Sequence, residues 1–486
     1  MKSRSLMCIT AVAMFGMVNS AQLSAQQIRY KLIDIPTLGG PSASGNVDCT
    51  ECAQFINDPG VVVGGSGNHA FRWQDGVLTD LGPGHATSIN ARGWATGGFP
   101  NAAIDPLTGG QTEHAVLWKD DHILDLGTLD HGVNSAGLYV NNAGEVVGFA
   151  TVDTTQDPFP NPNNPFSSPI HAFIWRDGVM RDLGTLGGLD SSPMGGCNNQ
   201  RVDLVSGWST TDLTLNPATG LPTEHAFLWQ NGSMTDIPTL GGTFAQGQCA
   251  NNQGQVIGQS NLAEDAGCDG SLTDGSCFQH AFFWDHGTLQ DLGTLGGTSS
   301  TSLWLNNNGE AVGAASTLGD AELHATLWKN GRITDLNRDG DCFSFANAVN
   351  ARHQIIGNTF NCDTGYFTTV LWENGSIIDL NAAIPENSSL FLVEPDNIND
   401  RGEIVGRGLP PGCDNPDMCG HVFLLIPCGA GSAQACEPTS TITPRSSVRI
   451  ATHHHTGTEF VNLWRAHLAQ SHHKRVLAMS WNSVVN

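Results

Sequence analysis

The sequence has few basic residues, with 21 Lys and Arg against 46 Asp and Glu and a formal net charge of −25 at pH 7. The body of the chain holds only 14 of the basic residues, because seven lie near its two ends: Lys2, Arg4, Arg445, Arg449, Arg465, Lys474 and Arg475. A body so poor in positive charge repels phosphate backbones and anionic lipid headgroups. We therefore expect no nucleic-acid partner.

Beyond its first residues the sequence also lacks a long apolar run. The early run from Leu6 to Val18 is too short to span a bilayer. It follows Lys2 and Arg4 and precedes small residues at Ala21 and Ala25, the order typical of an export signal. We predict a signal peptide over residues 1–25, with an N-terminal helix of the fold as the alternative. The mature chain is then extracellular or periplasmic, with no membrane span.

Familiar catalytic motifs are absent as well. The sequence contains no Gly-x-Ser-x-Gly elbow and no His-Glu-x-x-His helix, and no Lys accompanies its Gly-rich segments as in a phosphate-binding loop. Those segments are interpreted as turns. We predict no catalytic residue and leave the binding residues unassigned, although a carboxylate pair from distant parts of the chain stays open.

Cysteine is present, in an even number once the signal is removed. Of 13 cysteines, only Cys8 lies in the signal. An even count in an exported chain predicts disulfides. The candidate pairs are Cys49 with Cys52, Cys197 with Cys249, Cys268 with Cys277, Cys342 with Cys362, Cys413 with Cys419, and Cys428 with Cys436. Only Cys49 and Cys52 have the spacing of zinc ligands, and no second such pair follows, so we predict no metal site there.

What the sequence has in abundance is a repeat. His-Ala-Phe-x-Trp or a variant begins at His69, His114, His171, His225, His280, His324, Thr368 and His421. Seven copies carry the Trp, and an Asp follows each Trp by seven residues: Asp80, Asp125, Asp182, Asp236, Asp291, Asp335 and Asp379. Successive copies start 44 to 57 residues apart. A period of this length is typical of propeller blades.

Turn signals divide each copy into four strands. Asp-Gly or Asn-Gly lies between the Trp and the Asp, as at Asp177-Gly178, and supplies the positive φ angles of a two-residue hairpin. Thr-Leu-Gly-Gly or a variant follows the Asp. A third strand then ends at an Asn-x-x-Gly turn, as at Asn141 to Gly144, and a fourth strand follows. The unit is a four-strand antiparallel meander, and a β-helix is the alternative that we weighed.

The ends of the array suggest a ring. The N-terminal part of the array resembles a copy without its first strand; its strands are Lys31 to Ile35, Phe55 to Asn57 and Val61 to Gly64. The last segment, His421 to Ile426, resembles a first strand alone. We expect these four strands to share one sheet, which leaves no open edge. The predicted fold is all-β: an eight-bladed β-propeller over residues 28–427, closed by the C-terminal strand pairing with the N-terminal strands.

The connections of a meander alternate between two faces. Both tight turns fall on one face, so the loops that lead into each His-Ala-Phe strand share the other, which we call the long-loop face. The longest of these loops are 151–170, 209–224, 261–279 and 408–420. Long, irregular loops on a rigid scaffold are a common place for binding.

The recurring His and Asp admit a metal or acid–base role or a structural one. Hairpin register places Asp80 opposite Phe71 and diagonal to His69. A pair that recurs in every unit favours a buried hydrogen-bond clamp between neighbouring blades, since catalysis needs one distinctive constellation. We predict no cofactor, with calcium in the acidic loop from Glu264 to Asp274 as the alternative. Residues 428–486 are rich in Ser, Thr and His and are expected to form a flexible tail.

Two complete units, His171 to Gly188 and His280 to Gly297, resemble the bacterial HAF repeat. The resemblance covers about residues 28–427. It implies an exported bacterial protein and brings no activity or catalytic residue. We expect a monomeric, non-catalytic module that binds a glycan, a peptide or a cell-surface partner. A polysaccharide-acting hydrolase or lyase and a structural envelope protein are the alternatives.

Overall fold

The computed structural model describes residues 30–39, 56–120, 122–159, 164–194, 203–216, 220–263, 279–413 and 419–429. Almost every element in them is a β-strand: there are 31 strands, and the 3-10 turn η3 (Leu318–Asp320) lies between the strand that ends at Thr317 and the strand that begins at Leu323. No helix in these ranges is both long and apolar enough to cross a membrane. The predicted signal peptide and almost all of the predicted tail lie outside the described residues.

The strands form antiparallel meanders that follow one another along the chain. The first is β2 (Val62–Ser66), β3 (His69–Gln74) and β4 (Val77–Pro83), with Ile56 bridged to Val62. The next two are β5 (His85–Ile89), β6 (Ala95–Ile104), β7 (Gln111–Lys119) and β8 (His122–Asp125), and then β9 (Ser135–Val140), β10 (Val146–Thr151), β11 (Ile170–Arg176) and β12 (Val179–Asp182).

Two sheets of eight strands each contain two meanders. The first holds β13 (Ser191–Pro193), β14 (Leu204–Leu215), β15 (Pro222–Gln230), β16 (Ser233–Ile237), β17 (Gly241–Ala250), β18 (Val256–Leu262), β19 (Gln279–Asp285) and β20 (Thr288–Asp291). The second holds β21 (Gly296–Leu305), β22 (Glu310–Thr317), β23 (Leu323–Lys329), β24 (Arg332–Asp335), β25 (Phe343–Val349), β26 (Ile355–Asn361), β27 (Tyr366–Glu373) and β28 (Ser376–Asp379). In each sheet one parallel residue pair joins the meanders: Glu224 with Phe244, and Leu323 with Phe343.

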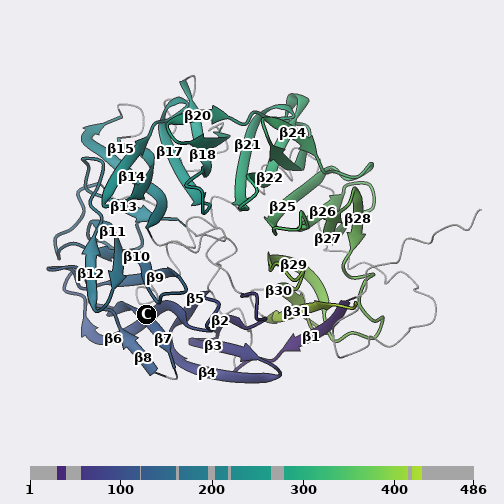
Figure 1. Cartoon of the computed structure of the whole chain (residues 1–486), viewed down its shortest axis with the longest axis horizontal. Coiled ribbons are helices and arrows are strands. Elements are labelled where there is room, and N and C mark those ends of the chain that lie inside the picture. Colours follow the sequence, from purple (N-terminus) through teal and green to yellow (C-terminus); the bar gives the residue numbers. More distant parts are fainter. Residues whose placement is uncertain are drawn as a thin grey trace, which may run out of the picture.

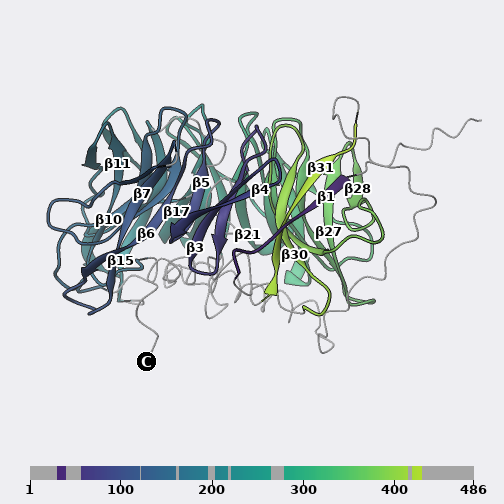
Figure 2. The same ribbon diagram turned by 90° about the horizontal axis from the view of Figure 1, so that it is seen from below.

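The last sheet contains both ends of the described chain. It consists of β29 (Phe391–Ile398), β30 (Ile404–Leu409), β31 (His421–Pro427) and β1 (Tyr30–Ile35), and β1 lies antiparallel to β31. Figure 1 shows β1 beside β31 and the sheets arranged around a common centre, the layout of a β-propeller. Seen from the side in Figure 2, the strands stand close together within a flat body.

The structure corrects how the unit is divided. In the structure, each meander begins with the strand that the sequence unit places third. The His-Ala-Phe strand is therefore the third strand of the meander and the Asp strand is its outermost, as in β9, β10, β11 and β12. The prediction that three N-terminal strands join the final strand is therefore wrong. Only β1 joins β29, β30 and β31. Ile56 instead forms a bridge with Val62 of β2, and β2 pairs with β3. Sequence spacing identifies the strands but cannot tell which turn lies between two sheets.

The hairpin turns form as the dipeptides predict. At the β11–β12 turn, Asp177 has φ 51° and Gly178 has φ 85°. Both values lie in the left-handed region that this two-residue turn requires and that Gly, Asp and Asn tolerate best. The turn sets the register, in which Trp175 pairs with Met180 and Phe173 pairs with Asp182.

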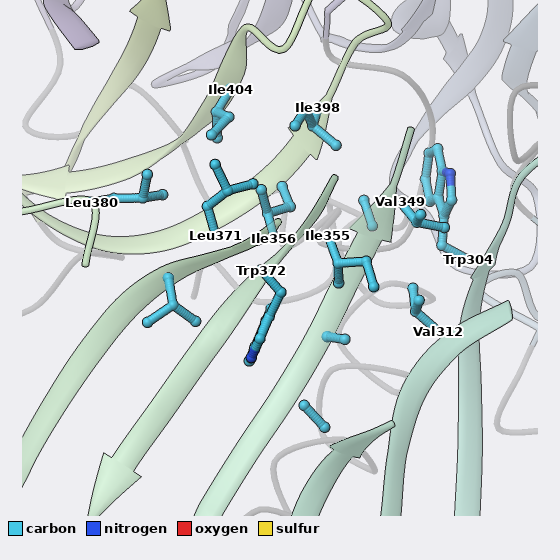
Figure 3. Close-up of a cluster of buried hydrophobic side chains, with 14 of the residues drawn as sticks. Trp304, Val312, Val349, Ile355, Ile356, Leu371, Trp372, Leu380, Ile398 and Ile404 are labelled. Carbon is cyan, nitrogen blue, oxygen red and sulfur yellow. The ribbon is translucent and has the colours of Figure 1, made fainter. Parts of the chain in front are cut away.

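The core lies between neighbouring sheets. Inner strands such as β9 and β10 are buried along their whole length, whereas outer strands such as β8 and β24 are exposed. The largest apolar cluster spans β17 to β31 and includes Tyr30 of β1. Figure 3 shows part of it, where Leu371 and Ile356 lie near Ile398 and Ile404, whereas Trp372 points away from them. Two repeat Trp side chains also donate hydrogen bonds across the gap: Trp118 Nε1 to Leu81 O and Trp372 Nε1 to Leu336 O. The repeat thus encodes the packing of one sheet on the next.

Candidate functional site

The recurring His and Asp side chains form hydrogen-bonded pairs at the two outer strands of a sheet. In each pair the His Nδ1 lies 2.8 to 3.0 Å from a carboxylate oxygen. The pairs are His69 with Asp80, His114 with Asp125, His171 with Asp182, His225 with Asp236, His280 with Asp291, His324 with Asp335, and His421 with Asp34.

These pairs confirm the predicted hydrogen bond but correct its place. Partners come from adjacent strands of one sheet, not from neighbouring sheets, and the Asp side chains are 28% to 56% exposed. The cross-strand diagonal brings His and Asp together without any second sheet. Burial opposes ionisation of Asp182, but hydrogen bonds from His171 and from the Gly184 backbone outweigh it and lower the pKa of this carboxyl. A pair repeated this often provides no unique site.

A second repeated contact, which spacing does not reveal, lies at the Asn-x-x-Gly turns and at their variant Asn350 to His353, where His replaces the Gly. Within each turn the Asn side-chain oxygen accepts hydrogen bonds from backbone N–H groups, as Asn350 does from Arg352 and Gln354. The same Asn donates through Nδ2 to the backbone oxygen of the equivalent Asn in the next meander. The described links run from Asn57 to Asn90, Asn90 to Asn141, Asn251 to Asn306, Asn306 to Asn350, Asn350 to Asn399, and Asn399 to Asn57.

We call this series the asparagine belt. Its last link joins residues 342 positions apart, from Asn399 Nδ2 to Asn57 O at 3.0 Å. At four junctions the residue after the Asn forms a parallel contact: the backbone N–H groups of Ala91, Asn252, Ala351 and Asp400 donate to Oδ1 of Asn142, Asn307, Asp400 and Asp58. The signal for the belt was present as an Asn at the same place in the turns, but spacing alone could not show that its amide reaches the next sheet.

The loops of the long-loop face depart from the repeat. β6 and β7, and likewise β14 and β15, continue beyond the neighbouring strands as extended hairpins. Four large apolar side chains on these loops and on η3 are exposed: Ile104, Leu107, Leu215 and Leu318. Most of the predicted loop 261–279 lies outside the described residues, including the acidic segment considered for calcium. Among the described residues no group of His, Cys, Asp or Glu has the arrangement of a metal site.

Two buried ionisable groups lie in the second meander, near the starts of β5 and β7. His85 and Glu113 lie 4.0 Å apart on β5 and β7, and neither His85 Nε2 nor Glu113 Oε1 has a hydrogen-bond partner among the described residues. Gly98 lies between them, where a Cβ atom would fall 1.9 Å from Glu113 Oε1. Burial lowers the pKa of His85 to about 4 and raises that of Glu113.

A second cluster lies between the third and fourth meanders. Asp157, on the loop between β10 and β11, and Asp190, just before β13, are 5% and 2% exposed. Burial raises the pKa of both carboxyls, and the charge of Glu224 raises that of Asp190 further. Perturbed carboxyls of this kind are common at functional sites. No repeat marks them in the sequence, which is why spacing did not single them out.

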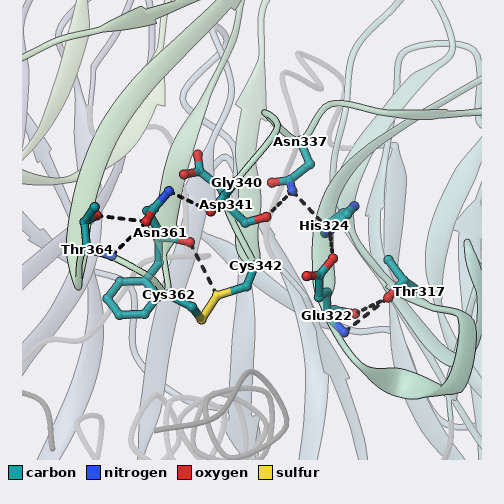
Figure 4. The surroundings of a disulfide bond; sticks show 11 residues. Thr317, Glu322, His324, Asn337, Gly340, Asp341, Cys342, Asn361, Cys362 and Thr364 are labelled. Atoms are coloured by element: carbon teal, nitrogen blue, oxygen red, sulfur yellow. Dashed lines mark hydrogen bonds and ion pairs between the residues drawn. A yellow bond between two sulfur atoms is a disulfide. The ribbon is translucent and has the colours of Figure 1, made fainter. Parts of the chain in front are cut away.

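Two of the six predicted disulfides form within the described residues. Cys342 is bonded to Cys362, and Cys413 to Cys419. Figure 4 shows the first, between the start of β25 and the segment after β26. Cys249 and Cys428 are also disulfide-bonded. Cys49, Cys52, Cys197, Cys268, Cys277 and Cys436 lie outside the described residues, so their predicted pairings remain predictions.

No family model matches the chain, and no curated protein matches it. Among solved structures, the chain is similar to the β-propeller domain of the trilobed protease from Pyrococcus furiosus, with 6% identity over 70% of this chain and 92% of that one, and a TM-score of 0.39. It is similar to TolB from Acinetobacter baumannii, with 12% identity over 69% and 81% of the two chains and a TM-score of 0.31. It is also similar to dipeptidyl peptidase 4 from Porphyromonas gingivalis, with 7% identity over 77% and 67% and a TM-score of 0.38. At these values the likenesses carry no argument about function, and the HAF repeat stays a prediction.

Proposed function

We propose that the chain is an eight-bladed β-propeller closed into a ring. Counting each meander as one blade gives seven blades from Ile56 to β28, and β29, β30, β31 and β1 form the eighth. Two observations support closure: the six-residue pairing of β1 with β31, and the link from Asn399 to Asn57. A closed ring leaves no blade without a neighbour on either side.

On this scaffold we infer an exported binding module that uses the long-loop face. The observation that carries the inference is how the repeated polar groups are used: the His, Asp and Asn of the units are engaged in hydrogen bonds that hold strands and blades together. What varies between units is the set of long loops. Variation confined to one face of a rigid scaffold is typical of recognition. Disulfides among the described residues are consistent with an oxidising compartment.

The partner class is a glycan, a peptide or a cell-surface component. The exposed apolar side chains of Ile104 and Leu107 offer contact area on the loop between β6 and β7. The few basic residues of the body disfavour polyanionic partners.

A panel of bacterial and plant polysaccharides and peptides immobilised on a surface tests this role. We expect saturable binding without release of sugar or peptide fragments. The double substitution Ile104→Ser/Leu107→Ser should weaken binding, whereas Val77→Ser/Val179→Ser, at similarly exposed residues beside the tight turns, should leave it unchanged. Equal effects of the two variants would contradict a role for the long-loop face. Absence of binding across the panel would favour a structural envelope protein.

A polysaccharide-acting hydrolase or lyase is the second candidate, favoured by the buried carboxyls of Asp157 and Asp190. Such enzymes use one carboxyl with a raised pKa as general acid and a second, ionised carboxyl as base or nucleophile, and burial raises the pKa of both carboxyls here. The burial of both side chains leaves little surface for a substrate, which is why we rank this candidate second. Sugar release by the wild-type protein that is lost in Asp190→Asn would support it and overturn the non-catalytic role.

A further inference from the structure

The turns of the asparagine belt hold a repeated set of ion pairs. In three of these turns the residue four positions after the belt Asn is Glu, and its carboxylate pairs with a cation. The pairs are Glu145 with Arg176, Glu310 with Lys329, and Glu403 with Arg401. Arg176 and Lys329 directly follow the repeat Trp, whereas Arg401 lies two positions after its belt Asn. In these turns the carboxylate therefore neutralises a cation from its own turn or from the adjacent hairpin.

The second meander keeps both kinds of cation but has no carboxylate at this place. Lys119 follows the repeat Trp and Arg92 lies two positions after Asn90, whereas the residue four positions after Asn90 is Trp94. Lys119 Nζ lies 4.2 Å and Arg92 Cζ lies 5.0 Å from the centre of a Trp94 ring. The ion pairs of Lys and Arg among the described residues all involve other cations. In a body with only 14 basic residues, two of them thus converge on one side chain without a carboxylate partner in the described chain.

Other contacts hold the Trp94 side chain in place. Trp94 Nε1 donates a hydrogen bond of 3.1 Å to Asp120 Oδ1, so this carboxylate binds the indole rather than either cation. The ring also rests on the turn of the third meander, since a Cβ atom on Gly144 would fall 2.9 Å from Trp94 Cζ3. Arg92 is exposed, and Trp94 and Lys119 are partly exposed. A cation that lies over an aromatic ring keeps N–H donors for another partner, so the two positive groups can bind an anion from solvent.

We propose that Arg92, Trp94 and Lys119 form a binding site for the carboxylate of a uronic acid on an otherwise neutral glycan. The carboxylate of the ligand takes the role that Glu145, Glu310 and Glu403 have in the equivalent turns, and the sugar ring that carries it packs its C–H groups on the exposed part of the indole. One carboxylate suits the site better than a polyanion, because the chain has a net charge of −25. The site lies among the tight turns, opposite the long-loop face, and therefore goes beyond the proposed function.

Titration calorimetry with matched probes tests the ligand. The probes are a xylo-oligosaccharide that carries one glucuronic acid, the same oligosaccharide without it, and a blocked tetrapeptide with a single Glu. The wild-type protein should bind the acidic sugar saturably and less tightly as salt rises, because the contact is between exposed charges. It should not bind the neutral sugar, and it should bind the peptide about tenfold more weakly or less, because the peptide lacks the sugar ring. Equal affinity for the two sugars, or binding of neither, would overturn the site, and a peptide that binds as tightly as the acidic sugar would overturn the glycan as its ligand.

Two substitutions copy residues from equivalent positions of other units, so the fold accepts both kinds of side chain there. Trp94→Glu supplies the carboxylate of the equivalent turns from within the chain and should abolish binding of the acidic sugar. Lys119→Gln introduces the residue that follows the repeat Trp at Gln230, and it should weaken binding by about tenfold or more, the effect of losing one hydrogen bond to a charged group.

Lys329→Gln is the matched control. It removes the equivalent cation of the sixth meander, which is already paired with Glu310, and it changes the net charge by the same amount as the other two substitutions. Its affinity for the acidic sugar should equal that of the wild-type protein. Trp94→Glu or Lys119→Gln in a folded protein that binds as tightly as the wild-type, or a loss in Lys329→Gln as large as in Lys119→Gln, would overturn the site.

Discussion

At the scale of single residues, close contacts between Gly and Phe determine how the middle strands pack. Gly148 on β10 lies against Phe173 on β11, where an added Cβ would fall 2.8 Å from the Phe173 ring and 2.0 Å from Ala136 O. The same contact recurs between Gly258 and Phe282 and between Gly406 and Phe423. The Phe of the repeat thus requires a Gly on the neighbouring strand.

Gly148→Ala should destabilise the protein by about 1–3 kcal/mol, the usual effect of overpacking a well-packed core. Chemical denaturation followed by Trp fluorescence measures the change. Val179→Ala, at an exposed residue of the same meander, serves as the control and should lie within about 0.5 kcal/mol of the wild-type protein. Equal stability of Gly148→Ala and the wild-type protein would mean that the strands can move apart at no cost.

His85 gives a prediction about acid. Burial lowers the pKa of this imidazole from 6.5 to about 4. Between those values the unfolded chain binds the proton and the folded chain does not, so the free energy of unfolding should fall as pH falls through this window. His85→Gln should remove that part of the fall. Thermal unfolding between pH 7 and pH 4 tests it, and an identical slope in the variant would show that His85 is not buried in its neutral form.

At the scale of elements, the tight turns do more than reverse the chain. Each Asn of the belt uses both ends of its side-chain amide. The oxygen accepts hydrogen bonds from its own turn, and the nitrogen donates one to the next meander. Asn350 illustrates this: Oδ1 accepts from Arg352 N and Gln354 N, while Nδ2 donates to Asn399 O and to Gln354 Oε1.

Asn350→Asp separates the two roles, since it keeps the oxygen acceptors and loses the donor. We expect a loss of stability of about 1–3 kcal/mol, because the buried Asn399 carbonyl loses a partner and a charge enters its place. Asn350→Ala should cost more, since it also removes the turn contacts. If Asn350→Asp and the wild-type protein are equally stable in denaturant titrations, the hydrogen bond from Asn350 Nδ2 to the next meander contributes nothing to stability.

The disulfide between Cys342 and Cys362 closes a segment of 20 residues that spans β25 and β26. Cross-links of this length restrict the unfolded chain and typically contribute about 3 kcal/mol. Cys342→Ala/Cys362→Ala should lower the unfolding free energy by about that amount in denaturant titrations. The disulfide between Cys413 and Cys419 closes a segment of only six residues, so Cys413→Ala/Cys419→Ala should lower the unfolding free energy by less. If Cys413→Ala/Cys419→Ala lost more stability than Cys342→Ala/Cys362→Ala, the stabilisation could not come from restriction of the unfolded chain.

Strands and turns were predictable because each is encoded locally. Asp-Gly and Asn-Gly specify hairpins, and a fixed spacing places Asp182 diagonal to His171 on the adjacent strand. The phase of the repeat was not predictable, since the Asp-Gly turn and the Thr-Leu-Gly-Gly segment look alike as boundaries. The burial of Asp157 and Asp190 was not predictable either, because they lie in two loops that no spacing relates.

At the scale of the whole molecule, the two ends of the described chain meet in one sheet. Asp34 and His421 form the His–Asp contact of the repeat across these two ends, at 2.9 Å between residues 387 positions apart. Lys31 stands opposite Ile426 in the same pairing. The proposed ring should unfold as one unit, because opening β1 from β31 exposes the edges of both strands.

An engineered cross-link between β1 and β31 tests the closed ring most directly. In Lys31→Cys/Ile426→Cys the new cysteines stand on paired residues, and peptide mapping should find a disulfide between them within the monomer. Lys31→Cys/Ile333→Cys, whose second cysteine lies on β24 in a different sheet, should give none. Closure predicts an intramolecular 31–426 bond in nearly all molecules; its absence, or a bond formed only between two chains, would contradict the ring.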